Sequence, residues 1–408
     1  MNINTVKRAS KRFSVQYLSM LDLQSYGADN IYPQRMRDLI ANSSTGGICV
    51  DRYQRFIEGN GFNDTNFSEY VCNRYGETID DIHHRISLDL AYYHGFALHV
   101  NYNMACEICE LQHIPFQNTR LEEENDEGHV LNIAVHPDWT GRKTRKGKRI
   151  SIDVNSVEKI HVFNPKRDVV MAQIIAAGGI ENYKGQILWV SLDGLYEYPK
   201  PIYDKVVTNL STDEALDNVK YRNTRNNFLI AGMLCRKKGG DLGIDENGKP
   251  IKSENNDKDF AQSLDIFQGD MNCCTIMDVT VNANEDYPEF KAVEGNNFDK
   301  KFTCTEDSVT SRIYSAFGQE PWLRIRTGDL GFSGKIIEEA YEYYNSFTDP
   351  VRRAISRAFK RIFSNWYELA NPSQDYLVQP LVYITNESNA TLSDTAGGSK
   401  TGSADRKG

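Results

Sequence analysis

The stretch from residue 319 to residue 345, QEPWLRIRTGDLGFSGKIIEEAYEYYN, decides how the second half of the chain is organised. Its first part carries a tryptophan, two arginines and three glycines. Glycine adopts backbone conformations that other residues avoid, so the sequence predicts a loop over residues 322–333 that can change its shape. Such a loop can cradle a phosphate, close over a substrate or reach into an opening.

An amphipathic helix is predicted after this loop, over residues 334–369. Apolar side chains recur there at spacings of three and four, which is the period of one helix face. Thr348-Asp349-Pro350 lies in the middle, and because proline has no N–H to donate, we expect the helix to kink or restart there. One strand-like piece (DYLVQPLVYI) follows Pro372, and the tail from residue 386 is predicted to be disordered.

The composition indicates a folded, acidic chain of two or three domains. The chain has 408 residues, 40% of them hydrophobic, and a formal net charge of -9. Affinity for DNA comes mostly from cations that release counterions, so an acidic protein is a poor static binder, although it can surround DNA without gripping it. No apolar run approaches the roughly 18–20 residues that span a bilayer, and we expect neither a membrane helix nor a secretory signal.

The cysteines raise the question of a metal site. Eight cysteines are spread along a chain long enough to fold without disulfides, which favours reduced thiols in a cytoplasm. Cys106 and Cys109 form a CxxC pair flanked by His99 and His113, a spacing that zinc sites also use. The surrounding run MACEICELQHIPF predicts a strand, however, and no second CxxC completes a set of four ligands. We therefore expect no metal and no cofactor.

The first 200 residues predict a mixture of helices and strands. An irregular arm covers residues 1–30, and a helical pattern then begins at Pro33, is interrupted by residues 43–47 and ends at residues 59–61. A second helix is predicted over residues 66–94, with Ile79, Ile82, Ile86 and Leu90 on one face. The predicted strands cover residues 96–100, 107–115, 130–136, 150–154, 159–162, 169–175 and 186–191.

Two loops of opposite charge lie between these strands. Residues 121–128 read LEEENDEG, and residues 141–149 read GRKTRKGKR. They are either two solvated hairpin tips or a subunit contact, in which the basic loop of one copy meets the acidic loop of its neighbour. The candidate contact residues are Glu122, Glu123, Glu124, Arg142, Lys143, Arg145 and Lys146.

A helix predicted over residues 201–228 leads into a small, separate block. The last turns of this helix (NVKYRNTRNNF) are almost entirely polar, so it has no apolar face to bury and must project or pack in an assembly. In the block, strands are predicted over residues 228–235, 275–281 and 289–293, and a helix over residues 259–267. Another helix, predicted over residues 302–317, leaves the block.

The sequence contains no motif for catalysis. It has no phosphate-binding loop, nucleophile elbow or HExxH metal motif, and all eight histidines precede residue 162. One alternative to a protein without catalysis is a site for phosphodiester chemistry, formed by Asp329 with Arg324 and Arg326. We therefore expect a protein that is not an enzyme.

In the order of these segments the chain resembles the portal proteins (head-to-tail connectors) of tailed bacteriophages. Residues 26–62, YGADNIYPQRMRDLIANSSTGGICVDRYQRFIEGNGF, resemble the first segment of many portals, and YYHGFALHVNYN and LQHIPFQNTRL resemble the body strands that follow. The most similar stretch is residues 306–363, EDSVTSRIYSAFGQEPWLRIRTGDLGFSGKIIEEAYEYYNSFTDPVRRAISRAFKRIF. It resembles a pattern of helix, aF-x-x-P-x-x-L, glycine-rich loop and proline-interrupted helix. The resemblance covers most of residues 26–385.

The resemblance implies an α+β portal-type fold. Residues 1–200 would be an N-terminal arm and a mixed wing domain, residues 201–228 and 298–321 a two-helix stem, and residues 229–297 a small α+β clip. Residues 322–333 would be the tunnel loop and residues 334–369 a long kinked tunnel helix. Residues 370–408 would be a short C-terminal crown and a disordered tail.

The resemblance also implies a function. Portals form a dodecameric ring at one capsid vertex and are the channel for double-stranded DNA during packaging and ejection. Their partners are the major capsid protein and scaffold, the terminase large subunit and a head–tail adaptor. The chain would be assembled in the cytoplasm of a host bacterium and reside in the virion, without a membrane contact.

Candidate residues for these roles follow from the resemblance. The tunnel-loop candidates are Trp322, Arg324, Arg326, Thr327, Gly328, Gly331 and Lys335, and the clip candidates for docking terminase or adaptor are Arg236, Lys237, Lys238 and Lys249. The loop arginines have an alternative role in salt bridges between subunits. The competing functions are a phage-encoded enzyme with a glycine-rich active-site lid and a different ring-forming head completion protein, such as an adaptor.

Overall fold

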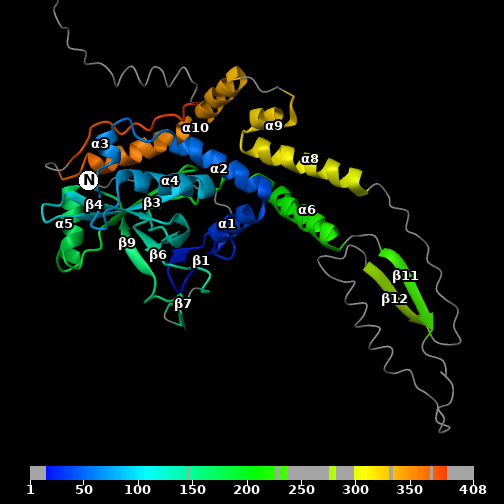
Figure 1. Cartoon of the computed structure of the whole chain (residues 1–408). Coiled ribbons are helices and arrows are strands. Elements are labelled where there is room, and N and C mark those ends of the chain that lie inside the picture. The colour runs from blue at the N-terminus through cyan, green and yellow to red at the C-terminus, as the bar shows by residue number, and fades with distance from the viewer. Residues whose placement is uncertain are drawn as a thin grey trace, which may run out of the picture. The chain divides into compact units, whose positions relative to one another are not determined.

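The computed structural model describes residues 15–142, 144–145, 147–226, 230–237, 275–281, 298–329, 334–367 and 371–383 (Figure 1). The chain divides into two compact units. The first combines Met1–Leu210 with Ser311–Gly408, and the second is Ser211–Thr310. The second unit is thus an insertion between two parts of the first.

A six-stranded mixed sheet organises the first unit. Its strand order is β4-β3-β10-β9-β6-β5. The strands are β3 (Gly95–Tyr102), β4 (Ile108–Ile114), β5 (Thr119–Leu121), β6 (Asn132–Val135), β9 (Glu158–Val162) and β10 (Gln186–Ser191). Neighbours are antiparallel except β9 and β10, which are parallel and joined by the helix α5 (Arg167–Ala176). Helices with a mixed sheet make the fold α+β, as the sequence predicts.

The sequence of β3 explains its place inside the sheet. All of its residues are buried except His99 and Asn101, which are partly exposed. A strand covered on both faces is an almost continuous apolar run, and GFALHVNY fits that description. Two short hairpins lie outside the sheet: β1 (Tyr17–Leu18) with β2 (Leu23–Gln24), and β7 (Thr144–Arg145) with β8 (Lys148–Arg149).

Helices from both ends of the chain pack together in this unit. They are α1 (Tyr32–Asn42), α2 (Ser44–Glu58), α3 (Thr65–Ser68), α4 (Ile79–Tyr93) and α10 (Gly334–Phe363). The helix α2 contacts both α4 and α10, and Figure 1 shows these helices side by side. Thr78 and Asp81 form a capping box that fixes where α4 begins. Its predicted apolar face is confirmed, because Ile79, Ile82, Ile86 and Leu90 are all fully buried.

The helix α10 continues through Pro350 without a restart. Pro350 has no N–H to donate to the Ser346 carbonyl. Side chains donate to two other carbonyls of the same turn, those of residues 344 and 345. The Thr348 hydroxyl donates to the Tyr344 carbonyl at 2.9 Å, and the Arg352 guanidinium donates to the Asn345 carbonyl at 2.6 Å. The helix ends at Phe363, so the predicted end at residue 369 is wrong.

Residues 371–383 pack back onto the first unit. The Gln379 N–H donates to the Gly61 carbonyl at 2.8 Å, and the Asn60 N–H donates to the Gln379 carbonyl at 3.1 Å. Gly59 permits this approach, because a Cβ there would lie 1.9 Å from the Gln379 carbonyl oxygen. The strand-like piece predicted here forms only an isolated bridge between Phe62 and Val378.

The second unit contains the end of α6 (Val207–Asn226), the strands β11 (Ile230–Lys237) and β12 (Thr275–Val281), and the start of α8 (Phe298–Ala316). A short 3-10 turn, Ile202–Val206, precedes α6. The two strands pair in parallel. The strands predicted over residues 228–235 and 275–281 correspond to β11 and β12. The predicted helix over residues 259–267 and the predicted strand over residues 289–293 lie outside the described residues.

Several predicted elements are wrong, each for a local reason. Residues 169–175 form most of the helix α5 rather than a strand, because a short apolar run has no decisive period. Residues 150–154 form no strand. The predicted interruption over residues 43–47 is confirmed at Ser43, which separates α1 from α2, but residues 44–47 already belong to α2, because the Ser43 side chain accepts the Gly46 N–H as its N-cap. The helix predicted over residues 66–94 is divided into α3 and α4.

No helix in the described ranges combines the length and the apolar character that crossing a membrane requires.

His83 is a polar side chain in the apolar interface of α4. It is fully buried against the ring of Phe62, with ring centroids 4.9 Å apart. Neither ring nitrogen has a hydrogen-bond partner among the residues that the structure describes. Burial lowers the pKa of His83 to about 4, so this histidine is neutral at pH 7.

We predict that this histidine makes the fold sensitive to mild acid. The unfolded chain takes up a proton near pH 6.5 and the folded chain does not, so stability falls as the pH drops from about 6.5 towards 4. The contribution of His83 is a loss of about 2 kcal/mol between pH 7 and pH 5. Chemical denaturation at the two pH values should show this loss in the wild type and a smaller one in His83→Leu.

The neighbouring histidine is a matched control. His84 is exposed and contacts the Glu58 carboxylate at 2.9 Å. His84→Leu should therefore keep most of the pH dependence. An unchanged pH dependence in His83→Leu would contradict the prediction.

Candidate functional site

The stretch that opens the second half of the chain is a helix where the sequence predicts a loop. Glu320–Thr327 forms α9, with Pro321 in its first turn. It ends at Gly328, whose φ of +85° lies in the left-handed region that glycine adopts without strain. Tunnel-loop candidates 322–327 are therefore helical, and the predicted loop start at residue 322 is wrong. Residues 330–333, which include the candidate Gly331, lie outside the described residues.

Trp322 is an anchor for α9 and not an exposed tip. Its ring packs edge-on against Tyr344 of α10 at 4.9 Å and against Phe56 of α2 at 5.6 Å. The Arg52 guanidinium lies over the same ring, 5.3 Å from its centroid. The aromatic surface of this tunnel-loop candidate is thus used in contacts within the chain.

Gln319, the residue before α9, joins three helices through one buried amide, and sequence reasoning missed it. Its Nε2 donates to the Cys49 carbonyl in α2 and to the Tyr344 hydroxyl in α10, both at 2.8 Å. Its Oε1 accepts from Arg52 at 2.8 Å. The side chain is fully buried, and a single glutamine beside a glycine carries no pattern that would have identified it.

Burial keeps this hydrogen-bond network in one protonation state. It raises the pKa of the Tyr344 hydroxyl above its ordinary value, so the group stays protonated. The hydroxyl donates to the Phe317 carbonyl at 3.0 Å while it accepts from Gln319. The base of α9 is therefore held by satisfied hydrogen bonds that do not titrate near neutral pH.

The remaining candidates around α9 face solvent. The side chains of Arg324 and Arg326 are exposed, as is Lys335 in the first turn of α10. The Thr327 hydroxyl donates to the Asp329 carboxylate at 2.8 Å. In the described part of this segment the arrangement is a rigid helix that presents exposed cations, which can contact a polyanion.

Glu122 in the acidic loop is used within the chain. Its carboxylate accepts from Lys159 at 2.8 Å and from Asn132 at 2.6 Å. These contacts tie the loop to β6 and β9. Glu122 is therefore a weak candidate for a contact between subunits. Glu123 and Glu124 are partly exposed in the same loop.

The acidic and basic loops lie at opposite ends of β6. The acidic loop precedes this strand and the basic loop follows it, and β6 belongs to the β5 end of the sheet. Arg142 is exposed, and its N–H donates to the Asp138 carboxylate at 2.8 Å. Arg145 belongs to β7 by its backbone. Lys143 and Lys146 lie outside the described residues.

Two of the four clip candidates lie in a described strand. Arg236 and Lys237 are the last two residues of β11. Lys238 and Lys249 lie outside the described residues.

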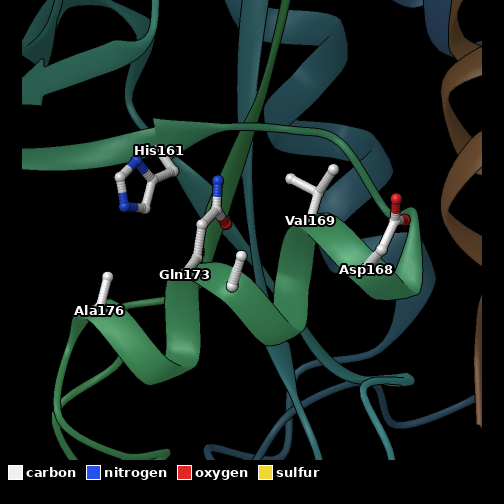
Figure 2. Close-up of a pocket in the computed structure, with 6 residues that line it drawn as sticks. His161, Asp168, Val169, Gln173 and Ala176 are labelled. Carbon is white, nitrogen blue, oxygen red and sulfur yellow. The ribbon is translucent and has the colours of Figure 1, made fainter.

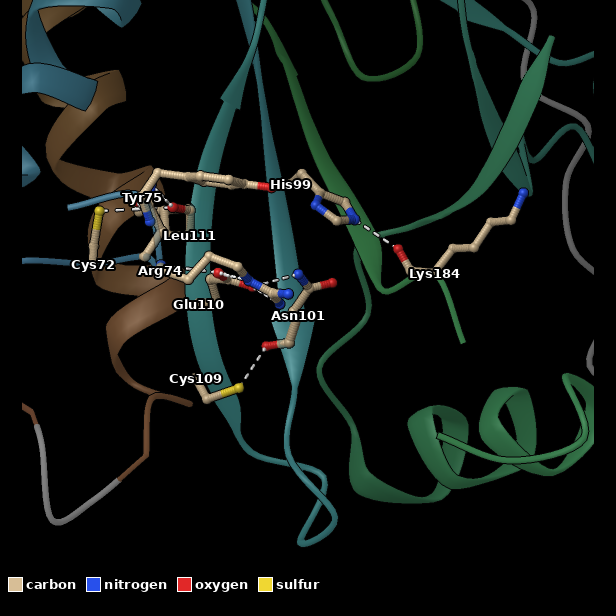
Figure 3. A network of polar contacts seen from close by, with 10 residues as sticks. Cys72, Arg74, Tyr75, His99, Asn101, Cys109, Glu110, Leu111 and Lys184 are labelled. Atoms are coloured by element: carbon tan, nitrogen blue, oxygen red, sulfur yellow. Dashed lines mark hydrogen bonds and ion pairs between the residues drawn. The ribbon is translucent and has the colours of Figure 1, made fainter. Parts of the chain in front are cut away.

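The CxxC pair is not brought together with its histidines as a ligand set. His99 donates to the Lys184 carbonyl at 2.6 Å and the Cys109 thiol donates to the Asn101 carbonyl at 3.6 Å (Figure 3). His113 contacts the Asp89 carboxylate at 2.7 Å. These three groups thus have partners other than one another. In the described part of the chain, no group of three His, Cys, Asp or Glu side chains is placed to hold a metal ion.

A hollow of about 320 Å³ beside this pair contains an ion pair. Arg74 donates from two nitrogens to the Glu110 carboxylate, both at 2.7 Å, and Figure 3 shows this pair at the β4 edge. The hydrogen bond from Arg74 lowers the pKa of Glu110 to about 2. Burial raises the pKa of Cys109. The acid is therefore ionised and paired and the thiol is protonated, which suits a structural role better than catalysis.

A second hollow, of about 390 Å³, lies along α5. Figure 2 shows His161 and Gln173 on one side of it and Asp168 at the other end of the helix. Burial lowers the pKa of His161, which keeps the ring neutral. The hollow lacks a nucleophile beside a base, so it offers no catalytic arrangement.

The chain was compared with known families and structures. No family model matches it, and no curated protein does. Among solved structures, it is similar to a chain of the virion of the native gene transfer agent particle, with 12% identity over 96% of this chain and 94% of that chain and a TM-score of 0.46. A chain from the neck of the native particle, computed with C12 symmetry, gives 13% identity over 89% and 87% of the two chains and the same TM-score.

A further similarity is to an HK97 family phage portal protein from Corynebacterium diphtheriae, with 10% identity over 66% of this chain and 72% of that chain and a TM-score of 0.27. The solved structures thus include a phage portal protein. That is the family which the sequence resembles. Each similarity is low, so a proposal of function has to rest on the residues and element order of this chain.

We predict that Trp322 contributes to the stability of the fold, whereas Arg324 and Arg326 contribute little. Trp322→Ala removes the aromatic contacts with Phe56 and Tyr344 and should lower the free energy of unfolding by about 2–3 kcal/mol. Arg324→Ala and Arg326→Ala should change it by less than about 0.5 kcal/mol, because both side chains are exposed. Denaturant unfolding of the three variants tests this. Equal effects at all three positions would show that Trp322 does not anchor the helix.

Proposed function

We propose that the chain is the subunit of a portal, a dodecameric ring at one vertex of a phage capsid. The ring is the channel for double-stranded DNA during packaging and ejection. It docks the terminase large subunit and later a head–tail adaptor, and it contacts the major capsid protein and scaffold. The subunit assembles in the cytoplasm of the host bacterium and is not an enzyme.

The order of elements carries this proposal. The chain leaves a mixed α+β body through α6, passes through a separate unit with β11 and β12, and returns through α8. It then forms α9 and the 30-residue helix α10. That succession matches the wing, stem, clip, stem and tunnel helix that the sequence resemblance implies. In the proposal, α6 and α8 are the stem and the unit between them is the clip.

The surface of α6 supports an assembled state. Residues 217–221 are all exposed, and they include Val219 and Tyr221. A helix end without a covered apolar face gains little stability from its own chain. The Lys220 ammonium pairs with the Glu306 carboxylate of α8, which joins the two proposed stem helices by charge. In a ring, packing between neighbouring stems would cover such a surface.

The fixed base and exposed arginines of α9 are suited to the wall of a channel. Its base is fixed by Trp322 and Gln319, while Arg324 and Arg326 are exposed on the same short helix. A translocating channel must not hold DNA, because each phosphate contact that releases a counterion adds affinity that has to be broken at the next step. A few cations on an acidic subunit guide DNA by weak contacts. Intersubunit salt bridges remain the alternative role for these arginines.

The competing functions make different demands on the chain. An enzyme with a lid needs titratable groups gathered in a cleft, and in the described residues Asp329 is exposed and bonded to Thr327. A shorter helical adaptor would not require the inserted unit. The element order therefore favours the portal.

The first prediction from this proposal concerns the assembly. Twelve copies of 46.5 kDa give a particle of about 560 kDa with a central opening. Native mass measurement and negative-stain imaging of the purified full chain test this. A monomer or dimer that persists at high concentration and with scaffold protein supplied would contradict the portal and favour an enzyme.

The second prediction concerns the exposed arginines of α9. Arg324→Ala combined with Arg326→Ala should leave the rings intact but reduce the fraction of DNA-filled heads, because the channel loses its weak phosphate contacts. The exposed cations Lys166 and Arg167 at the start of α5 provide a matched control, and replacing both with alanine should not affect filling. Packaging reactions scored for DNA per head measure the difference. Loss of rings in the α9 variant would favour the salt-bridge role.

A further inference from the structure

A basic groove lies between α10 and the segment that follows it. It has a volume of about 380 Å³, and Arg353, Arg357 and Lys360 line it from the helix. These residues are exposed and fall on one face, at spacings of four and three. Residues 374–377 form the opposite wall.

The groove keeps a net positive charge in spite of its one lining carboxylate. Asp375 is already engaged, because its carboxylate accepts from Asn63 at 2.7 Å and from the Leu377 N–H at 3.0 Å. Arg353 pairs with Asp349 on its own helix. Arg357 donates from Nε to the Arg353 carbonyl at 3.1 Å, which leaves its charge in place, and in the described residues neither Arg357 nor Lys360 forms an ion pair. These two are therefore the cations most available to an outside anion. The chain has a net charge of -9, so this cluster of cations stands out from the rest of the protein and attracts anionic groups.

The acidic loop presents an ordered anionic turn of complementary charge. The Gly128 N–H donates to the Asn125 carbonyl at 2.8 Å, and the Asn125 side chain accepts from the N–H groups of Glu127 and His129. Asp126 and Glu127 are the central residues of this turn, and both are exposed. The turn is thus preorganised, so a contact through it loses little conformational entropy.

The acidic turn and the residues that directly follow α10 lie at opposite edges of the sheet. The acidic turn connects β5 and β6, and β5 is one edge strand. The residues after α10 join the other edge strand, β4, because Ile108 donates to the Asn365 carbonyl at 3.0 Å and accepts from the Tyr367 N–H at 2.8 Å. Five strand spacings separate the two edges, which is roughly 24 Å.

We propose that the groove lined by Arg357 and Lys360 receives the turn with Asp126 and Glu127 of a neighbouring copy. This inference rests on the proposed ring. A ring needs a head-to-tail interface whose two halves lie on different sides of the subunit, and opposite edges of one sheet meet that need. The basic loop of residues 141–149 meets it less well, since it also adjoins β6 and therefore lies near the same edge of the sheet as the acidic turn.

Charge reversal in the full-length chain tests the contact. The groove variant carries Arg357→Glu and Lys360→Glu, and the turn variant carries Asp126→Lys and Glu127→Lys. Each variant alone places like charges in every interface, so the concentration needed for rings should rise by at least about tenfold. The control, Lys148→Glu with Arg149→Glu, reverses two exposed charges in the basic loop and should form rings like the wild type.

Mixing the two variants gives the decisive result. In an alternating ring, the unchanged turn of the groove variant meets the unchanged groove of the turn variant, and the two reversed partners also attract each other. Equimolar mixing should therefore restore rings, measured by native mass and negative-stain imaging. Circular dichroism and thermal melts of each variant confirm that the subunits are folded.

The other outcomes overturn the inference in distinguishable ways. Rings that form normally in both variants overturn the contact and leave the portal proposal standing. Loss of rings that mixing does not restore shows that these residues do not pair with each other. Loss of rings in the basic-loop control alone assigns the interface to that loop. A wild type that forms no ring overturns the proposed function and the contact together.

Discussion

The buried amide of Gln319 is the constraint on which the arrangement of the first unit depends. One side chain satisfies a carbonyl of α2, a hydroxyl of α10 and a guanidinium, and it does so where the inserted unit has ended and α9 begins. An unsatisfied amide in such a position would cost about 1–3 kcal/mol, so the three helices have to meet in this geometry. The place where the chain returns from its insertion is thereby fixed.

Buried arginines extend the same principle. Arg120 is fully buried, donates to the Asn30 side chain and to nearby carbonyls, and lies over the rings of Tyr26 and Trp139. Arg352 donates to the Phe56 and Asn345 carbonyls beside the proline of α10. Carbonyl and other uncharged oxygens accept from both guanidinium groups. Arginine suits this role because its five donors satisfy several carbonyls at once and it stays charged at neutral pH. The two cations connect the N-terminal segments to β5 and to α10.

The buried contacts fix the base of α9 and leave its two arginines exposed. The base of α9 is locked, so Arg324 and Arg326 project from a fixed position and not from a flexible loop. The acidic turn and the residues that directly follow α10 lie at opposite edges of one sheet, so the sheet separates the two proposed contact points. In the proposed ring this spacing would have to be fixed, because a small error in each interface accumulates with every copy.

The sequence by itself determined the elements whose pattern is local and strong. The face of α4 was predicted from Ile79, Ile82, Ile86 and Leu90, because a 3.6-residue period is visible over about three turns. The same holds for β12 and for most of α10, whose start at residue 334 was predicted. The portal resemblance was likewise available from the order of segments. Patterns of this kind arise from side chains close in sequence, which is why they can be read without a structure.

Only the tertiary structure decided what depends on distant partners. The run VVMAQIIA of α5 is compatible with a strand or a helix when only the sequence is known. The run EPWLRIRT of α9 was predicted to be mostly loop, and the structure shows a helix whose Trp322 packs against Phe56 and Tyr344. Gln319 and Arg352 are ordinary polar residues in the sequence, and their roles come from carbonyls about 270 and about 300 residues away. Burial, pKa shifts and the opposite placement of the two charged surfaces follow from packing, and packing is set by contacts that the sequence does not display.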